Sequence, residues 1–250
     1  MSDNYKESFE KTKKAGEIAA GALDEVAKII KPGIQTDKID KLCYEYINDN
    51  GAYSAPLLYR GFPKSCCTST NHIVCHGIPS DKILKDGDIV NVDVTALKDG
   101  WHGDTSRTYE IGEVSVKAKK LIKTTFDAMM KAIKIIKEDV FLGDIGATIQ
   151  NHVEAEGFSV VQDFCGHGIG RHFHQEPNVL HYGKKGTGER IKAGMIFTIE
   201  PMINFGKYET KTLNDGWTAV TKDKSLSAQF EHTIGVTKDG YEIFTLSKQQ

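Results

Sequence analysis

The chain has 250 residues, 39% of them hydrophobic and 26% charged, with a formal net charge of -2 at pH 7. This length and apolar content are enough for a hydrophobic core. The net charge is close to zero and acidic and basic residues are interspersed along the chain, which argues against nucleic acid or an acidic membrane as the main partner. The first residues contain no apolar run, and no later window is long enough to span a bilayer, so we expect a cytoplasmic protein.

Two segments of the chain, 28–51 and 134–157, are each predicted to form a helix-turn-helix unit. They align without a gap, both begin Lys-Ile-Ile-Lys, and both end on a glycine suited to a helix C-cap. Their apolar stripes share i, i+4, i+8 spacing and comprise Ile39, Cys43 and Ile47 in the first and Ile145, Ile149 and Val153 in the second. Amphipathic helices can resemble one another by chance. We nonetheless predict one domain, 1–250, with two pseudo-symmetric halves at about 14–110 and 118–245.

The segment "VNVDVTALKDGWHGDTSRTY" (90–109) reads as a β-hairpin with Asp99-Gly100 as its two-residue turn. Counting outward from the turn places Asp104 opposite Thr95 and Asp93 opposite Ser106. Asp93 and Asp104 then share one face, with their backbones about 7 to 8 Å apart. Two carboxylates that close repel each other unless a cation or a shared proton lies between them. Exposure at a strand end is the simpler alternative, and it is weaker for Asp93, whose valine neighbours should face a core.

Strand-like segments later in the chain repeat this arrangement. The run 84–95 aligns with 191–202, so that Asp93 corresponds to Glu200. Each run has a lysine, then a glycine, then a short β-rich stretch that ends in that carboxylate. A looser match relates Asp104 to Glu231, and the tripeptides around His76 and His167 are similar. Acidic residues from both halves are therefore expected to converge.

The segment "DFCGHGIGRHFHQEP" (163–177) is rich in histidine and glycine. Glycines on both sides of His167 oppose a regular helix and allow close approach of another group. His172 and His174 alternate with Phe173, so in an extended segment both histidines would point away from Phe173. The remaining histidines considered are expected to be structural: His102, His152, His181 and His232.

Together these residues predict a metal site with mostly oxygen donors. Asp93, Asp104, Glu200 and Glu231 with His167 suit Mn, Fe or Co and could hold two ions. An acid/base pair of carboxylates without metal is the alternative, but it leaves the histidines unexplained. The five cysteines form no C-x-x-C pair, so buried thiols are favoured over a structural zinc site (Cys43, Cys66, Cys67, Cys75 and Cys165).

In combination, the motifs resemble those of the methionine aminopeptidases, specifically the short type I form. They are "VCHGIP", "NVDVT", "HGDTSRTY", "CGHGIGRHFHQEP", "FTIEPM" and "DGWTAVTKDKSLSAQFEHTI", and the resemblance runs from about Lys14 to near Phe244. It implies an α/β (α+β) pita-bread fold, in which helices cover an antiparallel sheet with internal pseudo-two-fold symmetry. This agrees with the internal repeat described above.

The resemblance also implies roles for individual residues. The metal ligands would be Asp93, Asp104, His167, Glu200 and Glu231, of which Asp104 and Glu231 bridge two divalent ions (Co, Mn, Fe or Zn). Glu200 would also accept a proton from the attacking water, and His76 and His174 would hydrogen-bond the scissile amide and the tetrahedral centre. The methionine pocket would be lined by Tyr59, Phe62, Cys67, Phe173 and Trp217. Phe62 and Phe164 stand where many relatives carry tyrosine.

The implied activity is metal-dependent removal of N-terminal methionine from nascent chains with a small second residue. The expected setting is near the ribosome, with the enzyme as a monomer and with no nucleic-acid substrate and no membrane. A prolidase or proline-directed aminopeptidase of the same fold is one alternative. A non-catalytic binding relative is the other, and it is disfavoured because all five ligand positions are filled.

Overall fold

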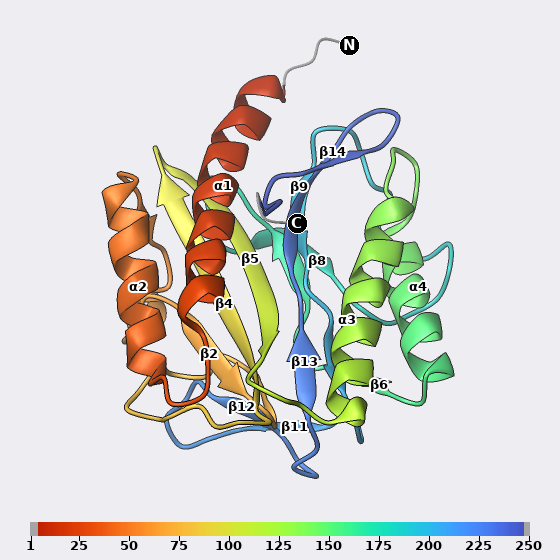
Figure 1. Ribbon diagram of the computed structural model, residues 1–250. Helices are drawn as coiled ribbons and strands as arrows, with labels where there is room; N and C mark the ends of the chain where they lie inside the picture. Colours follow the sequence, from red (N-terminus) through yellow and green to blue (C-terminus); the bar gives the residue numbers. More distant parts are fainter. Residues whose placement is uncertain (1–4, 248–250) are drawn as a thin grey trace.

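The computed structural model describes residues 5–247 of the chain. Two pairs of helices flank a central layer of antiparallel strands, with α1 and α2 on one side and α3 and α4 on the other (Figure 1). The helices are α1 (Lys6–Ile29), α2 (Thr36–Asp49), α3 (Val116–Lys134) and α4 (Leu142–Ala155), and a 3-10 turn covers Tyr59–Gly61. No helix within 5–247 is both long and apolar enough to cross a membrane.

The strands form four small sheets in which all pairs are antiparallel. One sheet contains β1 (Tyr53–Ser54), β2 (Cys67–Thr70), β4 (Ile89–Lys98) and β5 (Trp101–Glu110). A five-stranded sheet has the order β15 (Tyr241–Ile243), β14 (His232–Val236), β9 (Ile196–Ile199), β7 (Gly166–Gly168) and β8 (Gln175–Val179). The two three-stranded sheets are β13 (Ser227–Gln229), β10 (Met202–Asn204) and β6 (Ser159–Val160), and β11 (Thr210–Thr212), β12 (Ala219–Thr221) and β3 (Ile73–Cys75).

The predicted helical stripes are confirmed. Every stripe residue of α2 and α4 is fully buried: Ile39, Cys43, Ile47, Ile145, Ile149 and Val153. Gly51 and Gly157, which follow these helices, have φ angles of 65° and 83°, as a left-handed C-terminal residue requires. Local amphipathicity and terminal glycines therefore explain where these helices lie.

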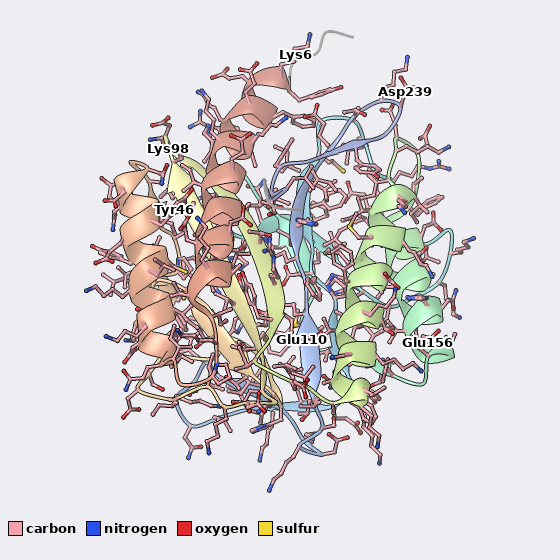
Figure 2. The ribbon with its side chains drawn as sticks, in the orientation of Figure 1. Lys6, Tyr46, Lys98, Glu110, Glu156 and Asp239 are labelled. Carbon is pink, nitrogen blue, oxygen red and sulfur yellow. The ribbon has the colours of Figure 1, made fainter. Side chains whose placement is uncertain are left out.

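Each helix pair covers its own apolar core. One cluster packs α1 and α2 against β4, and a larger one packs α3 and α4 against β9, β10, β13 and β14. Charged side chains such as Glu156 and Asp239 point outward at the periphery (Figure 2). Each helix pair thus covers its own set of strands.

Helix α1 lies unusually close to β5. A Cβ atom on Gly103 would come 2.2 Å from the backbone nitrogen of Gly16, so only glycine fits at this contact. Since Gly103 precedes Asp104, this packing fixes the backbone next to one of the candidate metal ligands.

Candidate metal centre

The β4–β5 hairpin carries the first two candidate ligands in the predicted register. Asp104 pairs with Thr95 and Asp93 with Ser106. The turn residues Asp99 and Gly100 have φ angles of 50° and 79°, the two positive values that a type I′ turn needs. Both aspartates line one cavity, so the prediction of a shared face is confirmed.

The remaining candidate ligands reach this cavity from the five-stranded sheet and its ends. His167 lies on β7, Glu200 directly follows β9, and Glu231 directly precedes β14. An isolated bridge between Ser106 and Glu231 joins that sheet to β5. The structure thereby brings all five predicted ligand residues to one cavity.

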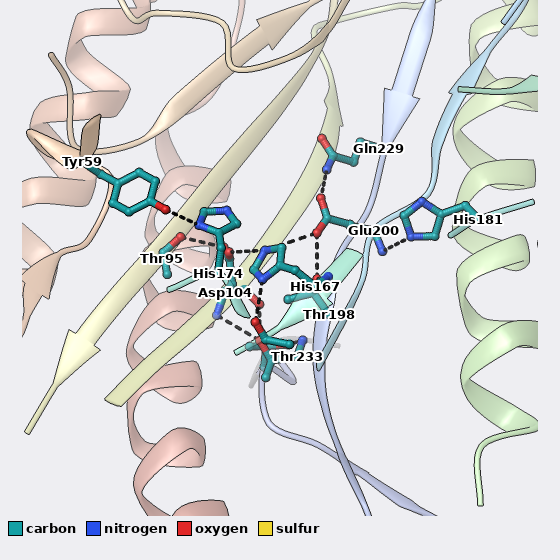
Figure 3. A network of polar contacts seen from close by, with 12 residues as sticks. Tyr59, Thr95, Asp104, His167, His174, His181, Thr198, Glu200, Gln229 and Thr233 are labelled. Carbon is teal, nitrogen blue, oxygen red and sulfur yellow. Dashed lines mark hydrogen bonds and ion pairs between the residues drawn. The ribbon is translucent and has the colours of Figure 1, made fainter. Parts of the chain in front are cut away.

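The ligand atoms lie close enough to share ions. His167 Nε2 is 3.8 Å from Asp104 Oδ2 and 3.5 Å from Glu200 Oε1 (Figure 3). One possible ligand atom each from Asp104, His167 and Glu231 all lie within 4.8 Å of one another. Such spacing suits coordination of a common cation better than direct hydrogen bonding.

The four carboxyl groups of this cluster are largely buried and lie close together, so their ionised forms need a positive charge nearby. Burial raises the pKa of Asp93 to about 7 and that of Glu200 to about 8. Burial, with repulsion from the neighbouring carboxylates, also raises the pKa values of Asp104 and Glu231. No lysine or arginine within 5–247 forms an ion pair with any of the four.

Two further observations fit a divalent cation. Glu231 Oε1 is buried without a hydrogen-bond partner, which is costly unless something else satisfies it. Desolvation lowers the pKa of His167 to about 4, so its imidazole is neutral near pH 7 and can donate a lone pair. Four carboxylates and one neutral imidazole therefore match the donors of Mn, Fe or Co.

Threonine hydroxyls hold the candidate ligands in place. Thr95 Oγ1 donates to Asp104 Oδ1 at 2.7 Å. Thr233 Oγ1 accepts from the Asp104 backbone N–H at 3.0 Å and donates to the Asp104 carbonyl at 2.8 Å. Asp104 is thus fixed through both its side chain and its backbone.

Thr198 connects two candidate ligands. Its Oγ1 accepts from the His167 backbone N–H at 3.0 Å and donates to Glu200 Oε1 at 2.7 Å (Figure 3). The backbone N–H of Glu200 donates to Nε2 of fully buried His181 at 3.1 Å, and Gln229 Nε2 donates to Glu200 Oε2 at 3.4 Å. Sequence reasoning missed Thr198, although its position two residues before Glu200 on a strand places both side chains on one face.

A cavity of about 360 Å³ opens above the carboxylates. The structure places all five predicted methionine-pocket residues along it: Tyr59, Phe62, Cys67, Phe173 and Trp217. Phe62 packs edge-on against Trp217, with ring centroids 5.2 Å apart. Phe164 also lines it, and so do Cys75, Cys165 and Met202, which were not predicted to do so. Aromatic rings and sulfur atoms give walls that suit an apolar, polarizable side chain.

The two non-ligand histidines lie at the same cavity. His174 Nδ1 is 3.1 Å from the Tyr59 hydroxyl, and its ring centroid is 4.1 Å from that of His167. His76 packs edge-on against Phe164 and has a left-handed φ of 56°. A left-handed backbone is uncommon for a residue other than glycine, and strain of this kind is often found at functional sites.

The alternation expected if residues 172–174 were extended does not occur. Residues 171–174 form successive bends rather than an extended strand. Phe173 and His174 consequently line the same cavity, whereas His172 faces a different one, beside Trp101. Strand alternation could not apply because this segment has no strand pairing.

Most other predictions about histidines and cysteines agree with the structure. His102 stacks on Phe173 and its Nδ1 lies 2.8 Å from the Gly170 carbonyl oxygen, while His232 Nδ1 lies 2.8 Å from Thr245 Oγ1. Four of the cysteines are buried free thiols and Cys165 is half-buried. His181 is a buried structural residue, as expected, yet its contact is with a candidate ligand.

Comparisons with known proteins agree with this geometry. The model of metallopeptidase family M24 matches residues 10–238. The chain is 57% identical to the methionine aminopeptidase of Rickettsia prowazekii over 97% of this chain and 94% of that protein. It is also similar to the crystal structure of methionine aminopeptidase from Thermotoga maritima, with a TM-score of 0.95 at 42% identity over 98% and 99% of the two chains.

A more distant likeness concerns the fold alone. The prolidase of Pyrococcus furiosus superposes with a TM-score of 0.77 at 23% identity, over 97% of this chain and 65% of that one. The mixed α/β architecture with antiparallel sheets and covering helices is the expected pita-bread fold, and that prediction is confirmed.

Proposed function

Because the chain belongs to metallopeptidase family M24, we propose that it removes the N-terminal methionine from peptides and proteins with a small second residue. The observation that carries this proposal is the convergence of four carboxylates and one neutral histidine beneath an apolar, sulfur-lined cavity. The near-full-length similarity to proteins named methionine aminopeptidase supports the same reaction.

Five residues would hold the metal. We propose Asp93, Asp104, His167, Glu200 and Glu231 as ligands for two divalent ions, with Asp104 and Glu231 shared between them. The orphaned Oε1 of Glu231 supports this assignment, because a cation would satisfy it. The donor set accepts Co, Mn, Fe or Zn, so availability in the cell would decide which metal is bound.

When bound, the ions would supply Lewis acidity, making a water more acidic and the scissile carbonyl more electrophilic. Glu200 would take the proton of the attacking water and pass it to the leaving amine. Burial raises its pKa to about 8 in the metal-free protein, which favours proton uptake at this carboxyl. His76 and His174 would hydrogen-bond the scissile amide and the developing oxyanion. The hydroxyl of Tyr59 would orient the His174 ring.

The cavity walls would select the first residue. An unbranched thioether would contact Phe62, Trp217 and Cys67, where sulfur–aromatic contacts would add to hydrophobic burial. Nascent chains near the ribosome are the proposed physiological substrates, with the enzyme acting as a cytoplasmic monomer.

The test is cleavage of Met-Gly-Met-Met, read as release of free methionine, with Met-Lys and Gly-Pro peptides as controls, after metal removal and restoration with Mn, Fe or Co. We expect release from the first peptide only. Asp104→Asn should abolish it, whereas Asp127→Asn, a matched change at an ion pair with Lys123 on α3, should not. Cleavage of the proline peptide would instead favour a prolidase, and no cleavage with any metal would favour a binding protein.

A further inference from the structure

Arg60 is the only lysine or arginine among the described residues that line the candidate cavity. The floor of the cavity is formed by buried carboxylates, but Arg60 is exposed and lies on the Pro56–Phe62 loop. No described carboxylate forms an ion pair with it. An arginine at a cavity mouth without an acidic partner is free to bind a carboxylate of a ligand.

The loop holds Arg60 in a defined but strained conformation. Leu58 and Arg60 have left-handed φ angles of 66° and 47° although neither is glycine. Two backbone hydrogen bonds close the loop, one from Leu58 N–H to the Phe62 carbonyl at 2.8 Å and one from Phe62 N–H to the Tyr59 carbonyl at 2.9 Å. Left-handed backbone at residues other than glycine is energetically costly and often occurs at ligand-binding sites.

The Arg60 guanidinium lies near Tyr59 and His174, at the end of the cavity where the scissile amide is proposed to bind. It lies 5.3 Å from the centre of the Tyr59 ring, and the Tyr59 hydroxyl is 3.1 Å from His174 Nδ1. Arg60 is therefore one aromatic ring away from a residue proposed to contact the scissile amide.

We propose that Arg60 binds a carboxylate of the substrate beyond its second residue, which makes the enzyme favour acidic groups there. This inference rests on the proposed function, because a methionine in the cavity directs the rest of the peptide past the cavity mouth. The carboxylate comes from an Asp or Glu side chain or from the C-terminus of a short peptide. If the Arg60 guanidinium only supported the Tyr59 ring, its removal would change kcat/KM for all substrates alike. A dependence of kcat/KM on substrate charge therefore distinguishes carboxylate binding from support of Tyr59.

The experiment compares kcat/KM for C-terminally amidated Met-Ala-Gly-Gly-Gly peptides in which Glu or Gln replaces the third, fourth or fifth residue. At low salt we expect Glu to exceed Gln by about two- to fivefold at one of these positions, the size of one exposed ion pair. The ratio should fall toward one at about 1 M salt. A tripeptide and a tetrapeptide, each as free acid and as amide, test the C-terminal source.

Variants identify the residue responsible. Arg60→Gln should bring the Glu/Gln ratio to about one, Arg60→Lys should retain most of it, and Arg60→Glu should favour Lys-containing peptides. Arg190→Gln is the matched control and should keep the parent ratio, because Arg190 is also exposed and stacked on a ring, that of Phe141, but lies outside the cavity.

The outcomes separate the two proposals. Cleavage of the neutral peptide with Glu/Gln and acid/amide ratios of about one would refute the Arg60 subsite and leave methionine removal intact. A ratio that survives in Arg60→Gln would do the same. Failure to cleave any peptide with any metal would refute the proposed function and the subsite with it.

Discussion

Replacing Thr198 by valine removes the hydroxyl that joins two candidate ligands while keeping the shape of the side chain. The hydroxyl donates to Glu200 Oε1 at 2.7 Å and accepts from the His167 N–H at 3.0 Å, and Thr198 is fully buried. A buried hydrogen bond to a charged group contributes about 1.5 to 3 kcal/mol. We therefore expect Thr198→Val to weaken metal binding by roughly 10- to 100-fold.

The assay is calorimetric titration of metal-stripped protein with Mn²⁺ at fixed pH. Thr198→Ser keeps the hydroxyl and should bind within about threefold of the parent. Thr125→Val makes the same isosteric change at a buried hydroxyl of α3 that donates to the Leu121 carbonyl, and it should leave the affinity unchanged. The hydrogen bond from Thr198 lowers the pKa of Glu200, so its loss should also move the onset of metal binding to higher pH.

A folded Thr198→Val protein that binds Mn²⁺ within twofold of the parent would refute the reasoning. A loss of folding stability without a change in Mn²⁺ affinity would not support the prediction. The orphaned His167 N–H should cost about 1 to 3 kcal/mol in unfolding free energy, which denaturant titration of the metal-free protein measures separately.

Three further predictions concern the site and its support. His76→Ala and His174→Ala should each lower kcat by about 100-fold or more while calorimetry shows metal binding retained; loss of the metal would reject the assigned roles. Gly103→Ala should destabilise the fold by about 3 kcal/mol or more in denaturant titration, because its Cβ would overlap the backbone of α1; a wild-type midpoint would contradict this packing. In the metal-free protein the pKa values of Asp93 and Glu200 are raised to about 7 and about 8. The native state therefore retains protons that the unfolded state has lost. The unfolding free energy should fall as the pH rises from about 6.5 to 8. Buried histidines with lowered pKa values act in the opposite direction only below about pH 6.5. Buried cysteines such as Cys67 and Cys75, whose pKa values are raised, act in the same direction but mainly above about pH 8, so the carboxyls dominate this window. Saturating metal should remove the fall, and a flat metal-free profile would be inconsistent with protonated carboxyls.

The sequence by itself determined the local elements of the site. The Asp99-Gly100 turn and the two-residue period of strands set the pairing of Asp104 with Thr95, and with it the shared face of Asp93 and Asp104. Helical stripes and terminal glycines likewise located α2 and α4. Such features depend on neighbouring residues and backbone geometry, so a single sequence contains the information.

Only the tertiary structure decided how distant segments meet. The bridge from Ser106 to Glu231 joins residues far apart in the chain, and no local periodicity specifies it. The bends at 171–174 turned Phe173 into the cavity, against the expected alternation. The role of the buried Thr198 hydroxyl follows from its contacts with His167 and Glu200, which only the fold shows. The strained backbone at Arg60 is likewise visible only in the structure. Side-chain packing between helices and sheets fixes such contacts, and it depends on the whole core rather than on adjacent residues.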